Sequence, residues 1–141
     1  MNNINAKSII LNVDSYKMSH VWQYPPNTEY VFSYVESRGG KYDETVMFGL
    51  QSYLKEYLSE PVTIDDVETA KQFIEGHGEP FNYGGWLRLI EKHEGYLPVE
   101  IKAVPEGTPV KVGNILVSVV NTDPEFFWLT SYIETSLLRA V

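Results

Sequence analysis

The segment from residue 99 to residue 120 constrains the fold most, because its apolar stretches are separated by very short turns. Apolar and charged residues alternate from Val99 to Ala103, which is the period of a half-buried strand. Two further strand candidates follow at 110–112 and 115–120, after turns that contain glycine. A parallel crossover needs about a dozen residues or more, so we expect these strands to pair antiparallel. The predicted fold class is α+β, with a mostly antiparallel sheet and flanking helices.

The first forty residues predict a helix followed by a strand. Asp14 is the expected N-cap of the helix, with its carboxylate accepting N–H groups of the first turn. Proline removes a donor and restricts the residue before it, so the helix should end near Pro25. Residues 30–35 combine β-branched and aromatic side chains, which predicts a strand covered on both faces.

Two further segments predict helices with apolar faces. The first is acidic and has Thr63 as its expected N-cap, with an apolar face made by Ile64, Val67, Ala70 and Ile74. The second runs from Pro124 to Val141 and carries two apolar stripes, one made by Phe126, Leu129, Ile133 and Leu137 and the other by Trp128 and Tyr132. We expect this last helix to need partners on more than one side, to leave apolar surface uncovered and to cause self-association. Its abrupt end predicts a chain that belongs to something longer.

Composition excludes several classes of function. The net charge is -8, and residues 56–94 hold nine acids against three bases, which argues against general nucleic-acid binding. No apolar run is long enough for a membrane span. The absence of cysteine excludes disulfides, thiolate metal sites and cysteine nucleophiles. We expect a cytoplasmic protein that binds neither nucleic acid nor membrane.

Two short motifs have both a structural and a functional interpretation. The segment 14–17 is either a capped helix start with a packed tyrosine, or an exposed aromatic plane, that of Tyr16, able to stack on a flat ligand. Arg38, followed by two glycines, is either a solvated turn residue or a planar fork of donors for phosphate. The residues alone favour the structural interpretation of the first motif. The three histidines lie in separate elements without the spacing of metal ligands.

Several stretches occur in a fixed order: Asp-Ser-Tyr-Lys-x-x-His at 14–20, Gln-Tyr-Pro-Pro-Asn-Thr at 23–28, Ser-Arg-Gly-Gly at 37–40, Glu-Ile-Lys-Ala-Val-Pro-Glu-Gly at 100–107 and Asn-Thr-Asp-Pro-Glu at 121–125. The stretch Trp-Leu-Thr-Ser-Tyr-Ile-Glu-Thr completes the series. Each is weak alone, but the ordered set is highly specific. From about Leu11 onward, the sequence resembles the N-terminal part of the nicotinamide phosphoribosyltransferase family.

The resemblance implies that residues 1–141 are an incomplete N-terminal α/β domain of a type II phosphoribosyltransferase, which would continue into a barrel domain. Such an enzyme transfers phosphoribosyl from phosphoribosyl pyrophosphate to nicotinamide, giving nicotinamide mononucleotide and pyrophosphate in NAD biosynthesis. Magnesium on the pyrophosphate, bound mainly outside this part, and ATP as a coupled substrate are also implied. Family members are homodimers with active sites at the subunit interface. This part alone, without the barrel, is expected to be inactive.

The resemblance also implies roles for three residues. Tyr16 would stack on the pyridine ring in the partner subunit's site, Asp14 would lie beside it, and Arg38 would contact phosphate. It implies no catalytic residue and no metal ligand in this part. Two alternatives stay open. One is nicotinate phosphoribosyltransferase, whose tendency toward Asp-x-Tyr followed by Thr-Met departs from the Lys-x-x-His found here. The other is a stand-alone, non-catalytic ligand-binding or dimerisation module.

Overall fold

A computed structural model describes residues 8–141. Its elements, in chain order, are η1 (Ser15–Trp22), β1 (Phe32–Glu36), β2 (Glu44–Val46), α1 (Leu50–Tyr53), η2 (Leu54–Leu58), α2 (Ile64–Gly76), α3 (Tyr83–His93), β3 (Val99–Ala103), β4 (Pro109–Lys111), β5 (Ile115–Asn121), η3 (Pro124–Phe126), α4 (Leu129–Tyr132) and α5 (Glu134–Leu138). Of these, η1 and η3 are 3-10 helices and η2 is a π-helical turn that continues α1.

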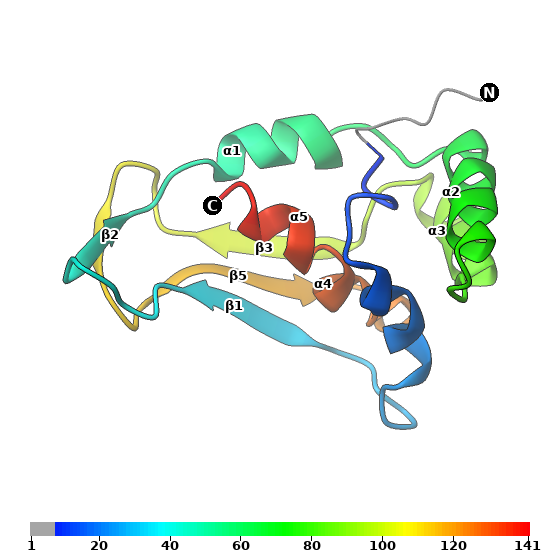
Figure 1. The fold of residues 1–141 in the computed structure, drawn as a ribbon, viewed down its shortest axis with the longest axis horizontal. Helices are drawn as coiled ribbons and strands as arrows, with labels where there is room; N and C mark the ends of the chain where they lie inside the picture. Colours follow the sequence, from blue (N-terminus) through cyan, green and yellow to red (C-terminus); the bar gives the residue numbers. More distant parts are fainter. Residues whose placement is uncertain (1–7) are drawn as a thin grey trace.

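The strands form two antiparallel sheets, which confirms the predicted fold class. The larger has the order β1-β5-β3 and the smaller pairs β2 with β4. Figure 1 shows α4 and α5 over one face of the larger sheet, α2 and α3 beyond one of its ends, and β2 and β4 beyond the other. No helix in the described part of the chain is long and apolar enough to cross a membrane.

The last segment does not form the single long helix that its sequence predicts. It is divided into η3, α4 and α5, and Ile133 sits between the two α-helices at φ -79° and ψ -6°. The Ser136 hydroxyl donates to the Ile133 carbonyl (3.0 Å), so a side chain competes there for the backbone acceptor. The Thr130 hydroxyl donates to the carbonyl of Val31 (3.0 Å) and ties α4 to the start of β1.

Both apolar stripes of this segment lie in the core of the chain. Leu129 and Ile133 are fully buried, and Trp128 and Tyr132 pack edge-on against the ring of Trp86 from α3. The expectation that this segment needs partners on two sides is therefore confirmed. The expectation that the two stripes leave apolar surface uncovered is wrong, because α3 and the larger sheet supply those partners within the chain; in this segment Leu138, outside both stripes, is 48% exposed.

Exposed apolar side chains are spread over several elements, and two of them are neighbours on β1. Phe32 and Tyr34 are 61% and 53% exposed, and they share the face of the larger sheet opposite α4 and α5 with Val120 of β5. The prediction that this strand is covered on both faces is wrong, because the described chain places helices on one side of the sheet only (Figure 1).

The helix α2 begins as its sequence predicts. The Thr63 hydroxyl accepts from the Asp66 N–H, while the Asp66 carboxylate accepts from the Thr63 N–H, and together they form a capping box. Val67, Ala70 and Ile74 are fully buried. Ile64 was expected on the same face but is 57% exposed, because the buried stripe of α2 begins one turn later.

Candidate functional site

Tyr16 stands near the start of η1 with its side chain directed largely into solvent. The residue is 58% exposed, and its ring lies 5.4 Å from the ring of His20, centroid to centroid. Its hydroxyl is 3.5 Å from the Asp14 carboxylate, which is at the limit of a hydrogen bond. The structure therefore presents an aromatic plane at this helix start, as the functional interpretation of the motif requires.

Asp14 does not cap η1 with its side chain, and that prediction is wrong. The N–H of Lys17 already donates to the backbone carbonyl of Asp14 (2.9 Å), because η1 begins as a 3-10 turn. The carboxylate instead accepts a hydrogen bond from the Thr135 hydroxyl (2.8 Å), and the Asp14 N–H lies 3.3 Å from the same oxygen. Asp14 thus fixes the start of η1 to α5.

Lys17 is a second attachment point that sequence reasoning did not single out. Only 6% of this residue is exposed, and its ammonium group forms an ion pair with Glu134 and a hydrogen bond with Ser131 (3.2 Å). A charged side chain is rarely buried unless it is paired. The available sequence signal is a lysine three residues after Asp14, which places both on one face of a 3-10 helix.

Arg38 lies in the loop after β1 and is exposed. Within residues 8–141 its guanidinium group has no hydrogen-bond or ion-pair partner. The loop itself is held by a hydrogen bond from the Gly113 N–H to the Ser37 carbonyl (2.9 Å). Gly39 has φ +103°, a conformation that other residues rarely adopt, so the turn beside Arg38 requires glycine. The geometry leaves the planar donor fork available to an anion.

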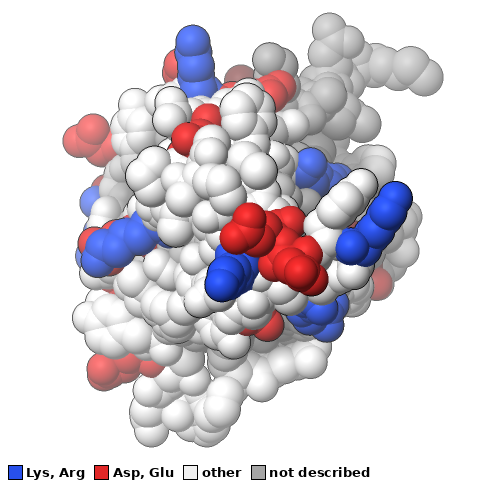
Figure 2. Space-filling model, turned by 90° about the vertical axis from the view of Figure 1, so that its left-hand side faces the viewer, with Lys and Arg blue, Asp and Glu red and all other residues white. Residues whose placement is uncertain are grey.

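The structure does not bring Arg38 and Tyr16 together. The helix η1 is tied to α4 and α5 near the start of β1, whereas Arg38 follows the end of that strand (Figure 1). Five strand residues alone span about 16 Å. Figure 2 faces the end at which β1 finishes and shows basic side chains scattered among acidic ones, without a broad basic patch.

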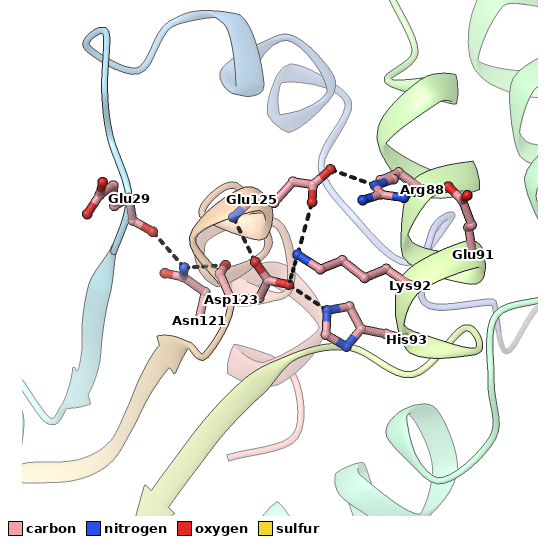
Figure 3. Close-up of polar contacts among 8 residues, drawn as sticks. All are labelled: Glu29, Arg88, Glu91, Lys92, His93, Asn121, Asp123 and Glu125. Carbon is pink, nitrogen blue, oxygen red and sulfur yellow. Dashed lines mark hydrogen bonds and ion pairs between the residues drawn. The ribbon is translucent and has the colours of Figure 1, made fainter.

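A polar network joins α3 to the turn after β5, within the stretch 121–125 (Figure 3). The carboxylate of Asp123 pairs with Lys92 (2.6 Å) and with the His93 ring (2.8 Å), and it accepts from the Glu125 N–H (3.0 Å). The hydrogen bond from Lys92, followed by those from His93 and the Glu125 N–H, lowers the pKa of Asp123 to about 2, against an opposing effect of burial.

The remaining groups of this network are paired in the same way. Glu125 accepts from Arg88 (2.9 Å) and Lys92 (3.1 Å), and these contacts lower its pKa. The amide of Asn121 bonds the backbone of residues 29, 31 and 123. Because these charged groups already face opposite charges, we interpret the network as a connection between elements of the fold. Sequence comparison pointed to this stretch, but the structure gives it a supporting role.

Comparison with known proteins shows which family shares this sequence and this fold. A family profile described as "Nicotinamide phosphoribosyltransferase, N-terminal domain" matches residues 8–101. The chain is 52% identical, over 132 residues, to a nicotinamide phosphoribosyltransferase of Xanthomonas campestris pv. campestris (strain 8004), with 94% of this chain covered. It is 36% identical, over 141 residues, to a protein of the same name from Acinetobacter baylyi, with 89% of this chain covered. The chain spans 28% of the length of each of these relatives.

Among solved structures, the chain resembles human nicotinic acid phosphoribosyltransferase with a TM-score of 0.61. The two are 22% identical, and the similarity covers 91% of this chain and 25% of the human one. At that identity the comparison concerns the fold alone. It agrees with an N-terminal portion of a type II phosphoribosyltransferase.

Proposed function

The chain belongs to the nicotinamide phosphoribosyltransferase family, and on that premise we propose that it forms part of an enzyme that transfers phosphoribosyl from phosphoribosyl pyrophosphate to nicotinamide. The observation that carries the proposal is the placement of the two candidate contacts. Tyr16 offers an exposed aromatic plane and Arg38 an unpaired donor fork, which suit a pyridine ring and a phosphate respectively.

The proposed reaction is a displacement at the anomeric carbon of the ribose. The lone pair of the nicotinamide ring nitrogen forms a bond to that carbon, and the bond from the carbon to pyrophosphate breaks. Pyrophosphate leaves with the electron pair, the ring nitrogen becomes cationic, and the products are nicotinamide mononucleotide and pyrophosphate. The carbon passes through an oxocarbenium-like state, as in other glycosyl transfers. Residues 8–141 would contribute positioning and charge compensation to this step.

The separation of the two contacts supports a site shared between two chains. The helix η1, which carries Tyr16, lies near the start of β1, and Arg38 follows the end of that strand (Figure 1). We call the part of the chain around Tyr16 the ring end and the part around Arg38 the phosphate end. In a two-fold symmetric homodimer, a contact between the ring end of one subunit and the phosphate end of the other occurs twice by symmetry. Two equivalent sites would result, each with Tyr16 from one subunit and Arg38 from the other. Asp14, attached to α5, would hold the ring end of each site.

Magnesium, ATP and the cellular compartment remain proposals on the family resemblance. Within residues 8–141, no cluster of three or more His, Asp or Glu side chains could hold a metal ion. We derive no step through magnesium. ATP coupling and the cytoplasmic location likewise stay predictions.

Nicotinate phosphoribosyltransferase is the alternative enzyme, and it would differ in the base that it accepts. Assays of the full-length protein with nicotinamide and with nicotinate, at equal concentrations, separate the two. The non-catalytic module would bind phosphoribosyl pyrophosphate without forming either mononucleotide.

The shared site is tested by mixing two variants of the full-length protein. Tyr16→Ala should raise the Michaelis constant for nicotinamide by up to about tenfold, which corresponds to a stacking contact of about 1.5 kcal/mol. Tyr16→Phe keeps the plane and serves as the matched control. Arg38→Ala should raise the Michaelis constant for phosphoribosyl pyrophosphate, and Arg38→Lys should restore it only in part, because the fork is lost.

After subunit exchange between Tyr16→Ala and Arg38→Ala chains, each mixed dimer should contain one site with both native residues. For equal amounts of the two chains, about a quarter of all sites would then be native. Activity of the mixture should exceed that of either variant alone when both substrates are kept low. No recovery after verified exchange would place both residues in one site and overturn the proposal.

A further inference from the structure

We propose that the start of α5, through Thr135 and Glu134, positions Tyr16 for contact with the pyridine ring. This inference rests on the proposed function of Tyr16. It assigns Thr135 and Glu134 as positioning residues, since they act through Asp14 and Lys17 and not on substrate.

The geometry of η1 gives these two attachment points a common direction. A 3-10 helix has three residues per turn, so side chains at positions i and i+3 lie above one another. Asp14 and Lys17 therefore face α5 together. The exposed ring of Tyr16 lies beside both of them, with its hydroxyl 3.5 Å from the Asp14 carboxylate and the Lys17 ammonium group 5.7 Å from its centroid. The observed exposure agrees with this arrangement, because Lys17 is 6% and Tyr16 58% exposed.

The first attachment is a single hydroxyl that bonds Asp14 twice. Thr135 donates to the Asp14 carboxylate (2.8 Å), and its oxygen faces the Asp14 N–H (3.3 Å). Both the backbone and the side chain of Asp14 are therefore tied to one buried residue. The Tyr16 hydroxyl lies 3.5 Å from the same carboxylate oxygen, so displacement of Asp14 would also move the ring's polar end.

The second attachment is the ion pair of Lys17 with Glu134. Lys17 is buried and Glu134 is half-exposed, so the lysine is the group that depends on its partner. Removal of the Glu134 charge would leave a buried ammonium group with only the Ser131 hydroxyl (3.2 Å). Lys17 would then move toward water, and the turn that carries Tyr16 would rotate with it.

The two attachments of η1 to α5 should determine the orientation of the Tyr16 ring. A short 3-10 helix has poor hydrogen-bond geometry of its own, so its orientation depends on such attachments. A stacking contact depends on ring orientation as well as ring presence. Loss of either attachment should thus weaken nicotinamide binding while the fold persists.

A double-mutant cycle in the full-length protein tests this. Thr135→Val keeps the shape of the side chain and removes the hydroxyl, whereas Thr135→Ser retains the hydroxyl and is the matched control. We expect Thr135→Val to raise the Michaelis constant for nicotinamide about three- to tenfold with turnover nearly unchanged, as for loss of uniform binding. Thr135→Ser should stay within about twofold of the native protein.

The decisive measurement is the same substitution in a Tyr16→Ala background. If Thr135 acts through Tyr16, Thr135→Val should change the Michaelis constant there by less than about twofold. An undiminished effect in that background, or no effect in the native one, would overturn the inference. If Tyr16→Ala itself leaves nicotinamide binding unchanged, the proposed role of Tyr16 fails instead, and the two failures are distinguishable.

Should Thr135→Val not fold, Glu134→Gln provides the same cycle at a half-exposed position. It keeps the side-chain shape and removes the charge that faces Lys17. Its effect on the Michaelis constant should likewise disappear in the Tyr16→Ala background. Urea unfolding of each variant, compared with the native protein, shows whether the fold is retained.

Discussion

Asn121 offers the sharpest test of how this fold is held together. Its side chain is 1% exposed at the end of β5 and makes three hydrogen bonds to backbone groups. The Val31 N–H donates to its oxygen (2.8 Å), and its amide nitrogen donates to the carbonyls of Glu29 (2.8 Å) and Asp123 (2.9 Å). One side chain thereby joins the approach to β1 with the turn after β5 (Figure 3).

The expected cost of Asn121→Ala follows from these three contacts. A net contribution of about 1 kcal/mol for each hydrogen bond gives a loss of about 3 kcal/mol in the free energy of unfolding. Folded domains typically have a free energy of unfolding of about 5–15 kcal/mol, and small domains lie near the lower end of that range. A loss of about 3 kcal/mol is therefore a large fraction of the total. With a urea m-value of about 2 kcal/mol/M, the midpoint should fall by about 1.5 M.

Urea unfolding followed by tryptophan fluorescence measures this change. Asn114→Ala is the matched control, because Asn114 is exposed and makes one local hydrogen bond, to the carbonyl of Lys111 (3.0 Å). The control should change the free energy of unfolding by less than about 0.5 kcal/mol. A loss below about 1 kcal/mol for Asn121→Ala would refute the view that this amide connects the two segments.

Asn121→Asp adds a signature in pH. The new carboxylate would face two carbonyl oxygens in a buried position, which raises its pKa in the folded state. Relative to the native protein, this variant should be most stable below the unfolded-state pKa of about 3.9 and lose stability as pH rises through the higher folded-state value. A relative stability that is constant with pH would show that the carboxylate reaches water.

Three other outcomes are expected. The pKa of Asp123 is lowered to about 2, so its contribution to stability should be complete above the ordinary value of 3.8 and disappear as pH falls through about 2; Asp123→Asn should remove this pH dependence in urea unfolding. Gly95→Ala should lower the melting temperature more than Gly78→Ala, since both have positive φ but only at Gly95 would the Cβ meet a backbone oxygen, at 2.3 Å. Replacing Phe32 and Tyr34 together by threonine should reduce self-association in light scattering and leave the unfolding free energy nearly unchanged, because both are exposed on a strand.

Local chemistry explains which parts of the fold could be predicted from sequence. The capping box of Thr63 and Asp66 involves residues three apart, so its signal is complete within one turn. β3 and β5 pair antiparallel as expected, but residues 104–114 with β4 lie between them, and β4 pairs with β2 in the other sheet, so the short turns predicted the direction of pairing and not the partners. The exposed plane of Tyr16 was likewise available from the motif as one of two interpretations.

Distant partners explain what could not be predicted. An aspartate is a common N-cap residue, yet the Asp14 carboxylate bonds Thr135, which is 121 residues away. Because η1 begins as a 3-10 turn, the carboxylate is not used as a cap and can accept that distant hydroxyl. Burial of the last segment depended equally on where α3 and the sheet would lie. Aromatic residues on β1 predicted a strand, but no local pattern states which of its faces the chain covers.

The two ends of the larger sheet depend on different parts of the chain, and this division follows from the fold. The proposed ring end is held by α5 through Thr135, so substitutions near residue 135 should act on the proposed contact of Tyr16 with nicotinamide. The proposed phosphate end is held by the bond between Ser37 and Gly113, next to the small sheet of β2 and β4, so substitutions near residue 113 should act on the proposed contact of Arg38. If each site takes one end from each subunit, the two kinds of substitution should complement one another in mixed dimers. A substitution in the core between the two ends, such as one at Asn121, destabilises the whole chain. No partner should complement it, because every site in a mixed dimer contains one end of the destabilised chain.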